Sequence, residues 1–276
     1  MEPLRFNNLE LRLANNAADL DAAQALRYRI FYEEMGAKPS SLCLEKARDV
    51  DRFDEICDHL LVIDLEKGTE SAPYVVGTYR FLRSSVAQKK WGFYSETEFD
   101  LCHLKVFPGE TMELGRSCID AAYRRRGAMQ LLWRGIATYI HIHDIQIMFG
   151  CGSIHGTDLK EQARVLSYLH HYHKAPGHLR PKALDEHYIL MKMMKRKEVD
   201  VELAQRELPP LLKGYLRLGG YIGDGAVIDH QFNTIDVCVI VETENVTSKY
   251  TRHFSRDRKE KLAPAVATGN PIQFYS

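Results

Sequence analysis

The sequence has no excess charge of either sign, no closely spaced pair of cysteines and no long apolar run. Lysine plus arginine and aspartate plus glutamate each number 37, so no global electric field favours a nucleic-acid partner. Six scattered cysteines without a C-x-x-C pair are typical of reduced thiols and argue against a disulfide framework. A membrane-spanning helix needs about 20 consecutive apolar residues, and no run approaches that length. The composition therefore predicts a soluble protein or one that lies on a membrane surface.

Signals for secretion and for metal binding are also missing. The first residues, Met1-Glu-Pro-Leu-Arg-Phe-Asn-Asn8, contain no apolar core of the kind that a signal peptide carries. His170, His171 and His173 cluster in the sequence, but adjacent positions on a helix do not face one another. No cysteine or histidine pair has zinc-finger spacing. We therefore expect a cytoplasmic location and no metal site.

The apolar patterns that are present predict an α+β fold. A chain of 276 residues, 45% hydrophobic and 27% charged, buries a core without disulfide or metal staples. Period-two and period-3.6 patterns predict strands at 9–13, 59–64, 74–82, 113–119, 145–149 and 235–241, helices at 19–35, 128–143 and 159–173, and a loop at 37–58. This order predicts a mixed, mostly antiparallel sheet flanked by helices.

Composition also suggests how the chain is divided. The segment Glu207–Pro210 marks a plausible boundary, and the last residues are basic and then rich in alanine, proline and glycine. We expect a body over residues 1–206, an extension packed on it over 207–245, and a flexible tail over 246–276.

The most informative stretch is the strand 113–119 and the basic turn after it. The turn places Arg124, Arg125 and Arg126 before Gly127, where the next helix begins. Free backbone N–H groups and the helix dipole make such a turn a natural phosphate cradle. A solvated basic turn explains the same residues equally well.

Glu113 and Arg116 are the charged residues of this otherwise apolar strand. Three residues apart, they point to opposite faces of a regular strand, but a β-bulge near Gly115 would bring them to one side. Neither charge is stable in a half-buried strand without a partner. We therefore predict either a catalytic carboxylate with a substrate-binding guanidinium or a structural ion pair.

The loop before the hairpin is acidic, with carboxylates at Asp49, Asp51 and Asp54. A carboxylate pair there would hold an ammonium group of a dicationic amino acid through charge-assisted hydrogen bonds. Interleaved basic residues leave a solvated acidic loop as the alternative. Cys151 has no identifiable base nearby, so a buried thiol is favoured over a nucleophile.

Three segments in order, Arg27-Tyr-Arg-Ile-Phe-Tyr-Glu-Glu-Met-Gly36, Asp49-Val-Asp-Arg-Phe-Asp54 and Glu113-x-x-Arg116, resemble one branch of the GNAT acyltransferase superfamily. That branch contains the acyl-homoserine-lactone synthases and the ornithine N-acyltransferases of ornithine-lipid synthesis. The resemblance to the ornithine enzymes is closer and covers roughly residues 10–245, including Gly77-Thr-Tyr-Arg-Phe-Leu82 and Phe149-Gly-Cys-Gly-Ser-Ile154. Lactone synthases usually carry tryptophan after the glycine that closes the first helix, and here that residue is Ala37.

The resemblance implies a GNAT-like fold with splayed central strands and a defined reaction. A 3-hydroxyacyl group would pass from acyl carrier protein to the α-amine of L-ornithine and give lyso-ornithine lipid. The phosphopantetheine arm of the carrier would present the donor, with no cofactor bound permanently. Further expected partners are the inner face of the cytoplasmic membrane and a second acyltransferase, and no nucleic acid.

The resemblance also assigns roles to residues of this chain. Glu113 would be the general base, and Tyr168, with Tyr172 as a competitor, would protonate the leaving thiolate. The alternative for either tyrosine is an ordinary core or surface residue. The amino-acid substrate would contact Asp49, Asp51, Asp54, Arg80 and Arg116. Arg124, Arg125, Arg126 and Gly127 would meet the phosphate and the acidic carrier.

Two other functions stay open at this point. An acyl-homoserine-lactone synthase would release a cyclised lactone into culture extract. A non-catalytic protein that binds acyl carrier protein or a lipid surface would show no turnover, and loss of Glu113 would leave it unchanged.

Overall fold

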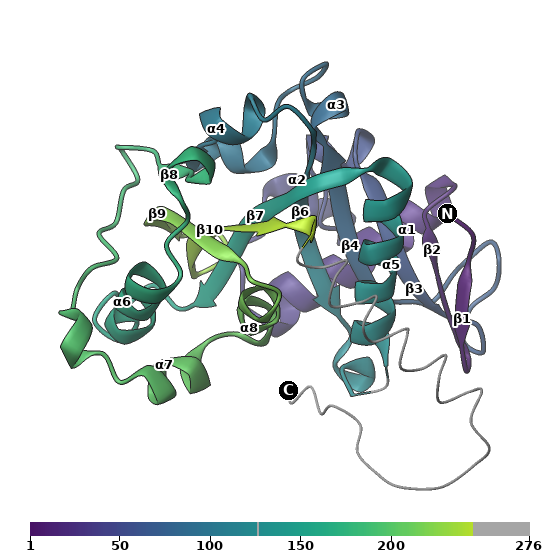
Figure 1. Cartoon of the computed structure of the whole chain (residues 1–276). Coiled ribbons are helices and arrows are strands. Elements are labelled where there is room, and N and C mark those ends of the chain that lie inside the picture. Colours follow the sequence, from purple (N-terminus) through teal and green to yellow (C-terminus); the bar gives the residue numbers. More distant parts are fainter. Residues whose placement is uncertain (126, 245–276) are drawn as a thin grey trace, which may run out of the picture.

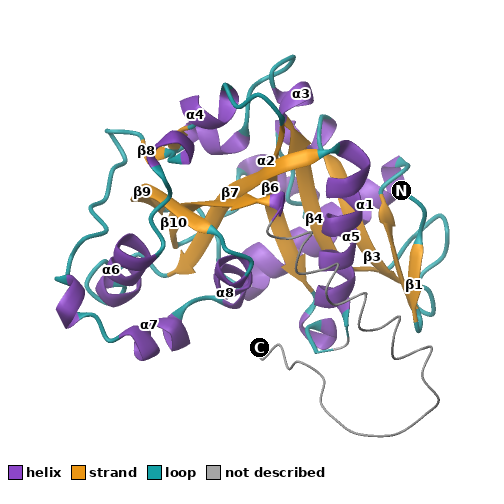
Figure 2. Ribbon diagram, viewed as in Figure 1, coloured by secondary structure: helices purple, strands orange, loops and turns teal. Residues whose placement is uncertain are grey.

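The computed structural model describes residues 1–125 and 127–244. Within them, ten strands form a sheet in the order β1-β2-β3-β4-β6-β7-β10-β9-β8-β5 (Figures 1 and 2). Neighbouring strands are antiparallel except for the β6–β7 and β8–β9 pairs. The strands are β1 Leu4–Phe6, β2 Leu9–Leu13, β3 Asp58–Asp64, β4 Val75–Arg83, β5 Phe99–Asp100, β6 Glu110–Ile119, β7 Ile145–His155, β8 Lys182–Ala183, β9 Tyr221–Asp229 and β10 Thr234–Glu242.

The described helices are short apart from two. They are α1 Ala17–Tyr28, α2 Ser41–Lys46, α3 Ser84–Ala87, α4 Cys102–Lys105, α5 Ala128–His143, α6 Ala163–Tyr172, α7 Val201–Glu207 and α8 Pro210–Arg217. The helix expected at 19–35 is α1 followed by a π-helical turn, Arg29–Glu34. The loop expected at 37–58 contains α2 and the 3₁₀ turn Arg52–Glu55. None of the helices described is long and apolar enough to cross a membrane.

The alternation of side chains along β3 shows how the sheet is covered. Leu60 and Val62 pack in the apolar cluster that includes α5, whereas Leu61 and Ile63 pack in the cluster that includes α1. Because successive strand residues point to opposite faces, α5 and α1 lie on opposite sides of the sheet (Figure 1). We call these sides the α5 face and the α1 face.

The C-terminal part of the described chain is built into the sheet. β10 pairs with β7 along its whole length and with β9 on its other side. The extension expected over 207–245 is described up to residue 244, and it supplies two strands of the body's own sheet, β9 and β10. The tail expected over 246–276 lies outside the described residues.

The feature that positions the site is the divergence of β6 from β7. Their parallel ladder ends at the pair Glu113–Phe149, although β6 continues to Ile119 and β7 to His155. Beyond this pair the two strands turn apart, as Figure 1 shows. The splayed central strands that were expected are therefore present, and the gap opens next to Glu113.

Candidate active site

Four polar residues on four central strands share the α1 face. They are Arg80 on β4, Glu113 on β6, Cys151 on β7 and Asp236 on β10. Successive side chains of a strand point to opposite faces of the sheet. The strand neighbours of these residues belong to the apolar cluster of the α5 face, so the residues themselves lie on the α1 face. Those neighbours include Tyr79, Phe81, Met112, Leu114, Ile235 and Val237.

Glu113 is held rigidly at the end of the β6–β7 ladder. Its Oε1 accepts hydrogen bonds from the backbone N–H and the hydroxyl of Ser95, at 2.7 and 2.5 Å. Its Oε2 accepts one from the backbone N–H of Tyr94 at 2.8 Å. Burial raises the pKa of Glu113 above its usual value, although these donors oppose the shift. The carboxylate is thus fixed in direction and retains acceptor capacity on Oε2.

Arg116 reaches the same face through the expected bulge. Between the pairs Thr78–Cys118 and Arg80–Gly115, β4 advances by two residues while β6 advances by three. Arg116 itself has φ +52°, a left-handed conformation that costs a non-glycine residue about 1 kcal/mol. Its guanidinium lies between the rings of Tyr94 and Phe232, 4.7 and 4.9 Å from their centroids.

The acidic loop forms a buried ion network with arginines and is not an open acidic pocket. Asp49 accepts from Arg27 Nε at 2.7 Å, and Asp54 accepts from Arg27 Nη2 at 2.7 Å and Arg80 Nη1 at 2.9 Å. Only 3% of either carboxylate side chain is exposed. Burial alone would raise the pKa of Asp54, but Arg27 outweighs it and holds that pKa below its usual range.

Asp51 is the member of this loop that stays accessible. Its side chain is 22% exposed and bonds Arg80 Nη1 at 2.7 Å and Arg116 Nη2 at 3.2 Å. Burial raises the pKa of Asp51, but the guanidiniums of Arg80 and Arg116 together lower it by more. The pKa therefore lies below its usual value. Arg116 is also 3.3 Å from Asp49, which joins the bulge to the network.

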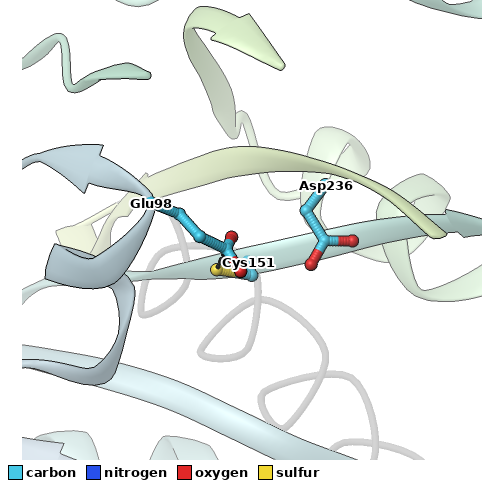
Figure 3. Close-up of side chains that lie close together, drawn as sticks. All are labelled: Glu98, Cys151 and Asp236. Carbon is cyan, nitrogen blue, oxygen red and sulfur yellow. Dashed lines mark hydrogen bonds between the residues drawn. The ribbon is translucent and has the colours of Figure 1, made fainter. Parts of the chain in front are cut away.

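A second acidic cluster, which the sequence did not predict, lies beside Glu113. The carboxylate oxygens of Glu98 and Asp236 and the sulfur of Cys151 all lie within 4.8 Å of one another (Figure 3). These donors come from a loop and two strands that are distant in the sequence, so no local pattern marked them. Two carboxylates and a thiol are also donors that a metal ion could use.

Hydrogen bonds connect this cluster to Glu113. The thiol of Cys151 donates to Glu98 Oε2 at 3.3 Å, and its sulfur is 3.2 Å from the hydroxyl of Ser95, which donates to Glu113. Burial raises the pKa of Glu98 to about 8 and that of Asp236 to about 6. Burial also raises the pKa of Cys151 well above its ordinary value, so the thiol stays protonated and inert as a nucleophile.

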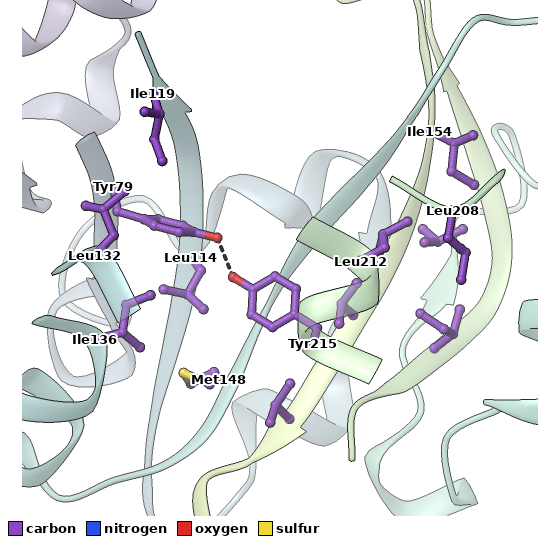
Figure 4. Close-up of a cluster of buried hydrophobic side chains, with 14 of the residues drawn as sticks. Tyr79, Leu114, Ile119, Leu132, Ile136, Met148, Ile154, Leu208, Leu212 and Tyr215 are labelled. Carbon is purple, nitrogen blue, oxygen red and sulfur yellow. Dashed lines mark hydrogen bonds between the residues drawn. The ribbon is translucent and has the colours of Figure 1, made fainter. Parts of the chain in front are cut away.

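Tyrosines occupy the other side of the gap, on the α5 face. Tyr79 and Tyr215 of α8 point toward one another and share a hydrogen bond next to Leu114 and Met148 (Figure 4). A cavity of only about 10 Å³ remains among these residues and the start of the gap. Tyr168 of α6 is in the same apolar cluster, but its hydroxyl bonds His173 at 2.8 Å and Gln205 at 3.0 Å.

The basic turn lies at the start of α5, as expected. Gly127 is the N-cap of that helix, with φ +85°. Arg124 forms an ion pair with Glu34 and donates to the carbonyl of Ile119 at 3.1 Å. Arg125 and Gly127 line an open pocket of about 440 Å³ that also includes Asn7, Asn8 and Gln130. Arg126 lies outside the described residues.

The chain is similar to several known proteins in sequence or in structure. A family profile described as an acetyltransferase (GNAT) domain matches residues 26–134. The AHL synthase LasI has 14% identity and a TM-score of 0.44, over 85% of this chain and 89% of LasI. An L-ornithine N(alpha)-acyltransferase of Brucella abortus (strain 2308) is 44% identical over 92% of this chain and 91% of its own length.

A second relative, from Rhizobium meliloti (strain 1021), has the same description. It is 43% identical over 94% of this chain and 88% of its own length. Identity at this level over nearly the whole of both chains, together with the splayed sheet, shows that the protein is an acyltransferase with a GNAT fold. The chain belongs to the L-ornithine N(alpha)-acyltransferase family.

Proposed function

We propose that the protein transfers a 3-hydroxyacyl group from acyl carrier protein to the α-amine of L-ornithine, which yields lyso-ornithine lipid. The names of its relatives support the acceptor. The observation that carries the proposal is the placement of Glu113 and Arg116 together on the α1 face, where the β6–β7 ladder ends. A base and an anion-binding group are what an amino acid needs if its amine is to attack a thioester.

Glu113 takes the proton from the α-ammonium, directly or through a water molecule. The amine nitrogen then attacks the thioester carbon, the C–N bond forms, and the C–S bond breaks as the thiolate leaves and is protonated. Negative charge develops on the carbonyl oxygen, and backbone N–H groups at the gap between β6 and β7 are suited to stabilise it. Orientation in a ternary complex supplies the remaining acceleration, without a covalent enzyme intermediate.

Arg116 and Asp51 bind the acceptor. The guanidinium of Arg116, 12% exposed, pairs with the α-carboxylate, and Asp51, 22% exposed, accepts from the α-ammonium. Arg80 keeps Asp51 in place through its 2.7 Å bond. The buried Asp49 and Asp54 support this arrangement from within the ion network.

The donor approaches the α5 face. Arg124, Arg125 and Gly127 lie at the start of α5, where a phosphate of the phosphopantetheine arm and the acidic surface of the carrier would both find positive potential. The arm belongs to the carrier, so the protein itself requires no bound cofactor. The product retains a free 3-hydroxyl group on its acyl chain, which a second acyltransferase at the inner face of the membrane can esterify.

One assay tests the proposal. The protein is incubated with 3-hydroxyacyl carrier protein and an equimolar mixture of amino acids, and N-acyl products are identified by mass spectrometry. We expect N-acyl-ornithine as the main product. A cyclised lactone, turnover with acetyl-CoA in place of the carrier, or no product with any amino acid would each contradict the proposal.

A further inference from the structure

The acidic cluster of Glu98 and Asp236 has no cation of its own. Neither carboxylate forms an ion pair with any residue that the structure describes. Asp236 is only 5% exposed, and its Oδ1 has no hydrogen-bond partner. The hydroxyls of Ser153 and of Thr234, two residues earlier on the same face of β10, lie close enough to lower the pKa of Asp236, but the buried Thr234 hydroxyl makes no hydrogen bond of normal geometry. Buried acceptors without donors are costly, so they indicate a donor that arrives from outside.

In the neighbouring ion network, by contrast, the buried carboxylates are neutralised by arginines. There, Asp49, Asp51 and Asp54 are matched by three arginines that contact them directly. Arg116 is the guanidinium that acts on Glu98 and Asp236, but only through space, because its hydrogen bond goes to Asp51. The arginines therefore neutralise the ion network, whereas the negative charge of the acidic cluster is not neutralised by a contacting cation among the described residues.

The position of the cluster connects it to the transfer step. Cys151 is two residues beyond Phe149, the last residue of β7 that pairs with β6. The Cys151–Ser95 contact joins the cluster to Glu113, and Asp236 points toward Glu98 and Cys151 in Figure 3. A group bound here would lie close to Glu113, to which the cluster is joined through Ser95 and Cys151.

We propose that Glu98 and Asp236 bind the side-chain ammonium of the amino-acid acceptor and thereby select a diamino acid. This inference rests on the proposed function and adds the origin of its specificity. An ammonium group has three N–H donors and no acceptor, which matches a cluster made of carboxylate oxygens and a buried hydroxyl. Arg116 and Asp51 then hold the carboxylate and the α-ammonium at the other end of the same molecule.

The cluster's protonation is consistent with this role. A free carboxylate pair at this depth holds a proton near neutral pH, as the raised pKa values of both groups indicate. Arrival of an ammonium lowers both pKa values and releases that proton. Removal of one carboxylate should therefore weaken binding of a cationic side chain and leave a neutral side chain nearly unaffected.

The test compares ornithine with norvaline, which has the same carbon skeleton and lacks the side-chain amine. Glu98→Gln and Asp236→Asn are assayed with both amino acids and with acylated carrier protein. For ornithine we expect kcat/KM to fall about 30-fold or more, mainly through KM, which is the loss when a desolvated charge pair loses one partner. For norvaline we expect kcat/KM to change by less than about 3-fold. Asp185→Asn removes an exposed carboxylate that pairs with Lys182 and serves as the control.

Each other outcome has a defined meaning. A parallel loss for ornithine and norvaline in folded variants overturns the proposal, because the cluster would then serve the reacting amine. A stoichiometric divalent metal that dialysed wild-type protein retains and both variants lose overturns it as well. A wild-type enzyme that acylates both amino acids equally refutes the subsite alone, whereas one that acylates neither refutes the proposed function. Thermal unfolding of each variant, with Glu98→Asp as a second replacement, separates these results from misfolding.

Discussion

At the scale of single residues, the site depends on which carboxylates are free to act. Three carboxylates of the acidic loop looked equivalent in the sequence, but the structure separates them. Asp49 and Asp54 form buried ion pairs with arginines, whereas Asp51 remains partly exposed to solvent. Roles in binding and roles in folding can therefore be assigned to different members of one short segment.

Glu113 is the residue on which the proposed chemistry depends. Glu113→Gln preserves the shape of the side chain and its contact with Ser95, but it removes the basic oxygen pair. We expect kcat to fall roughly 10²–10⁴-fold, the usual contribution of general base catalysis, with KM for the carrier nearly constant. Steady-state kinetics on a variant with wild-type thermal stability checks this. An unchanged kcat would exclude Glu113 from the mechanism.

The acidic loop gives a prediction in two parts. Asp51→Asn should raise KM for ornithine and for norvaline alike, because the contact is to the α-ammonium that both carry. Asp49→Asn and Asp54→Asn should instead lower stability, by up to about 3–5 kcal/mol, since each removes one of the two carboxylates that neutralise the buried guanidinium of Arg27. Denaturant unfolding measures the second effect. A loss of stability in Asp51→Asn as large as in Asp49→Asn would contradict this division.

Two tyrosines are candidates to protonate the leaving thiolate in the proposed reaction. Tyr168 was expected in this role from the resemblance, and Tyr215 lies in the lining of the small cavity at the gap. If Tyr168 acts, Tyr168→Phe should lower kcat by at least about 10-fold and Tyr215→Phe should not. The reverse pattern would transfer the role to Tyr215. Pre-steady-state measurement of thiol release distinguishes a chemical effect from slow product dissociation.

At the scale of elements, the turn before α5 is the part that we propose meets the donor. Acyl carrier proteins are acidic, so their encounter with this turn should weaken as salt shortens the Debye length to about 8 Å at physiological ionic strength. Arg125→Glu should raise KM for the carrier and flatten its dependence on salt, with KM for ornithine unchanged. Lys89→Glu, an exposed charge reversal on the loop after α3, is the matched control. Equal effects of the two variants would show that only net charge matters.

The strands show how far the sequence could lead. Period-two alternation in β3 and β4 and the charged pair in β6 were sufficient to predict the hairpin, the bulge near Gly115 and the shared face of Glu113 and Arg116. The strand predicted at 145–149 stopped short of Cys151, which lies on the longer β7. The cluster of Glu98, Cys151 and Asp236 was not predicted, because it depends on β10 entering the sheet between β7 and β9. Such non-local pairing leaves no periodic signal in a single sequence.

At the scale of the whole molecule, the acidic cluster makes stability depend on pH. Glu98 and Asp236 have pKa values raised by burial to about 8 and about 6. Their contribution to stability is complete below the pKa values of the unfolded chain and is lost as pH rises through the folded values. Asp51 and Asp54 act oppositely, but only in acid, because their pKa values are lowered.

We therefore expect the free energy of unfolding of the wild type to fall by about 1–2 kcal/mol between pH 6.5 and pH 9, relative to Glu98→Gln. Urea unfolding of both proteins at several pH values measures this difference. Saturating ornithine should reduce the slope in the wild type, since a bound cation compensates the ionised carboxylates. Parallel curves for the two proteins would show that Glu98 does not titrate in this range.

The insertion of β10 beside β7 has a consequence for how the protein is made. β7 ends at His155 and its partner begins at Thr234, so about 80 residues of chain must be synthesised between them. At 5–20 residues per second, one edge of β7 stays unpaired on the ribosome for roughly 4–16 s. An open strand edge of this length recruits other chains readily. Interrupted synthesis should therefore yield an aggregating fragment and not a weaker enzyme, because the same late strand carries Asp236 into the proposed acceptor site.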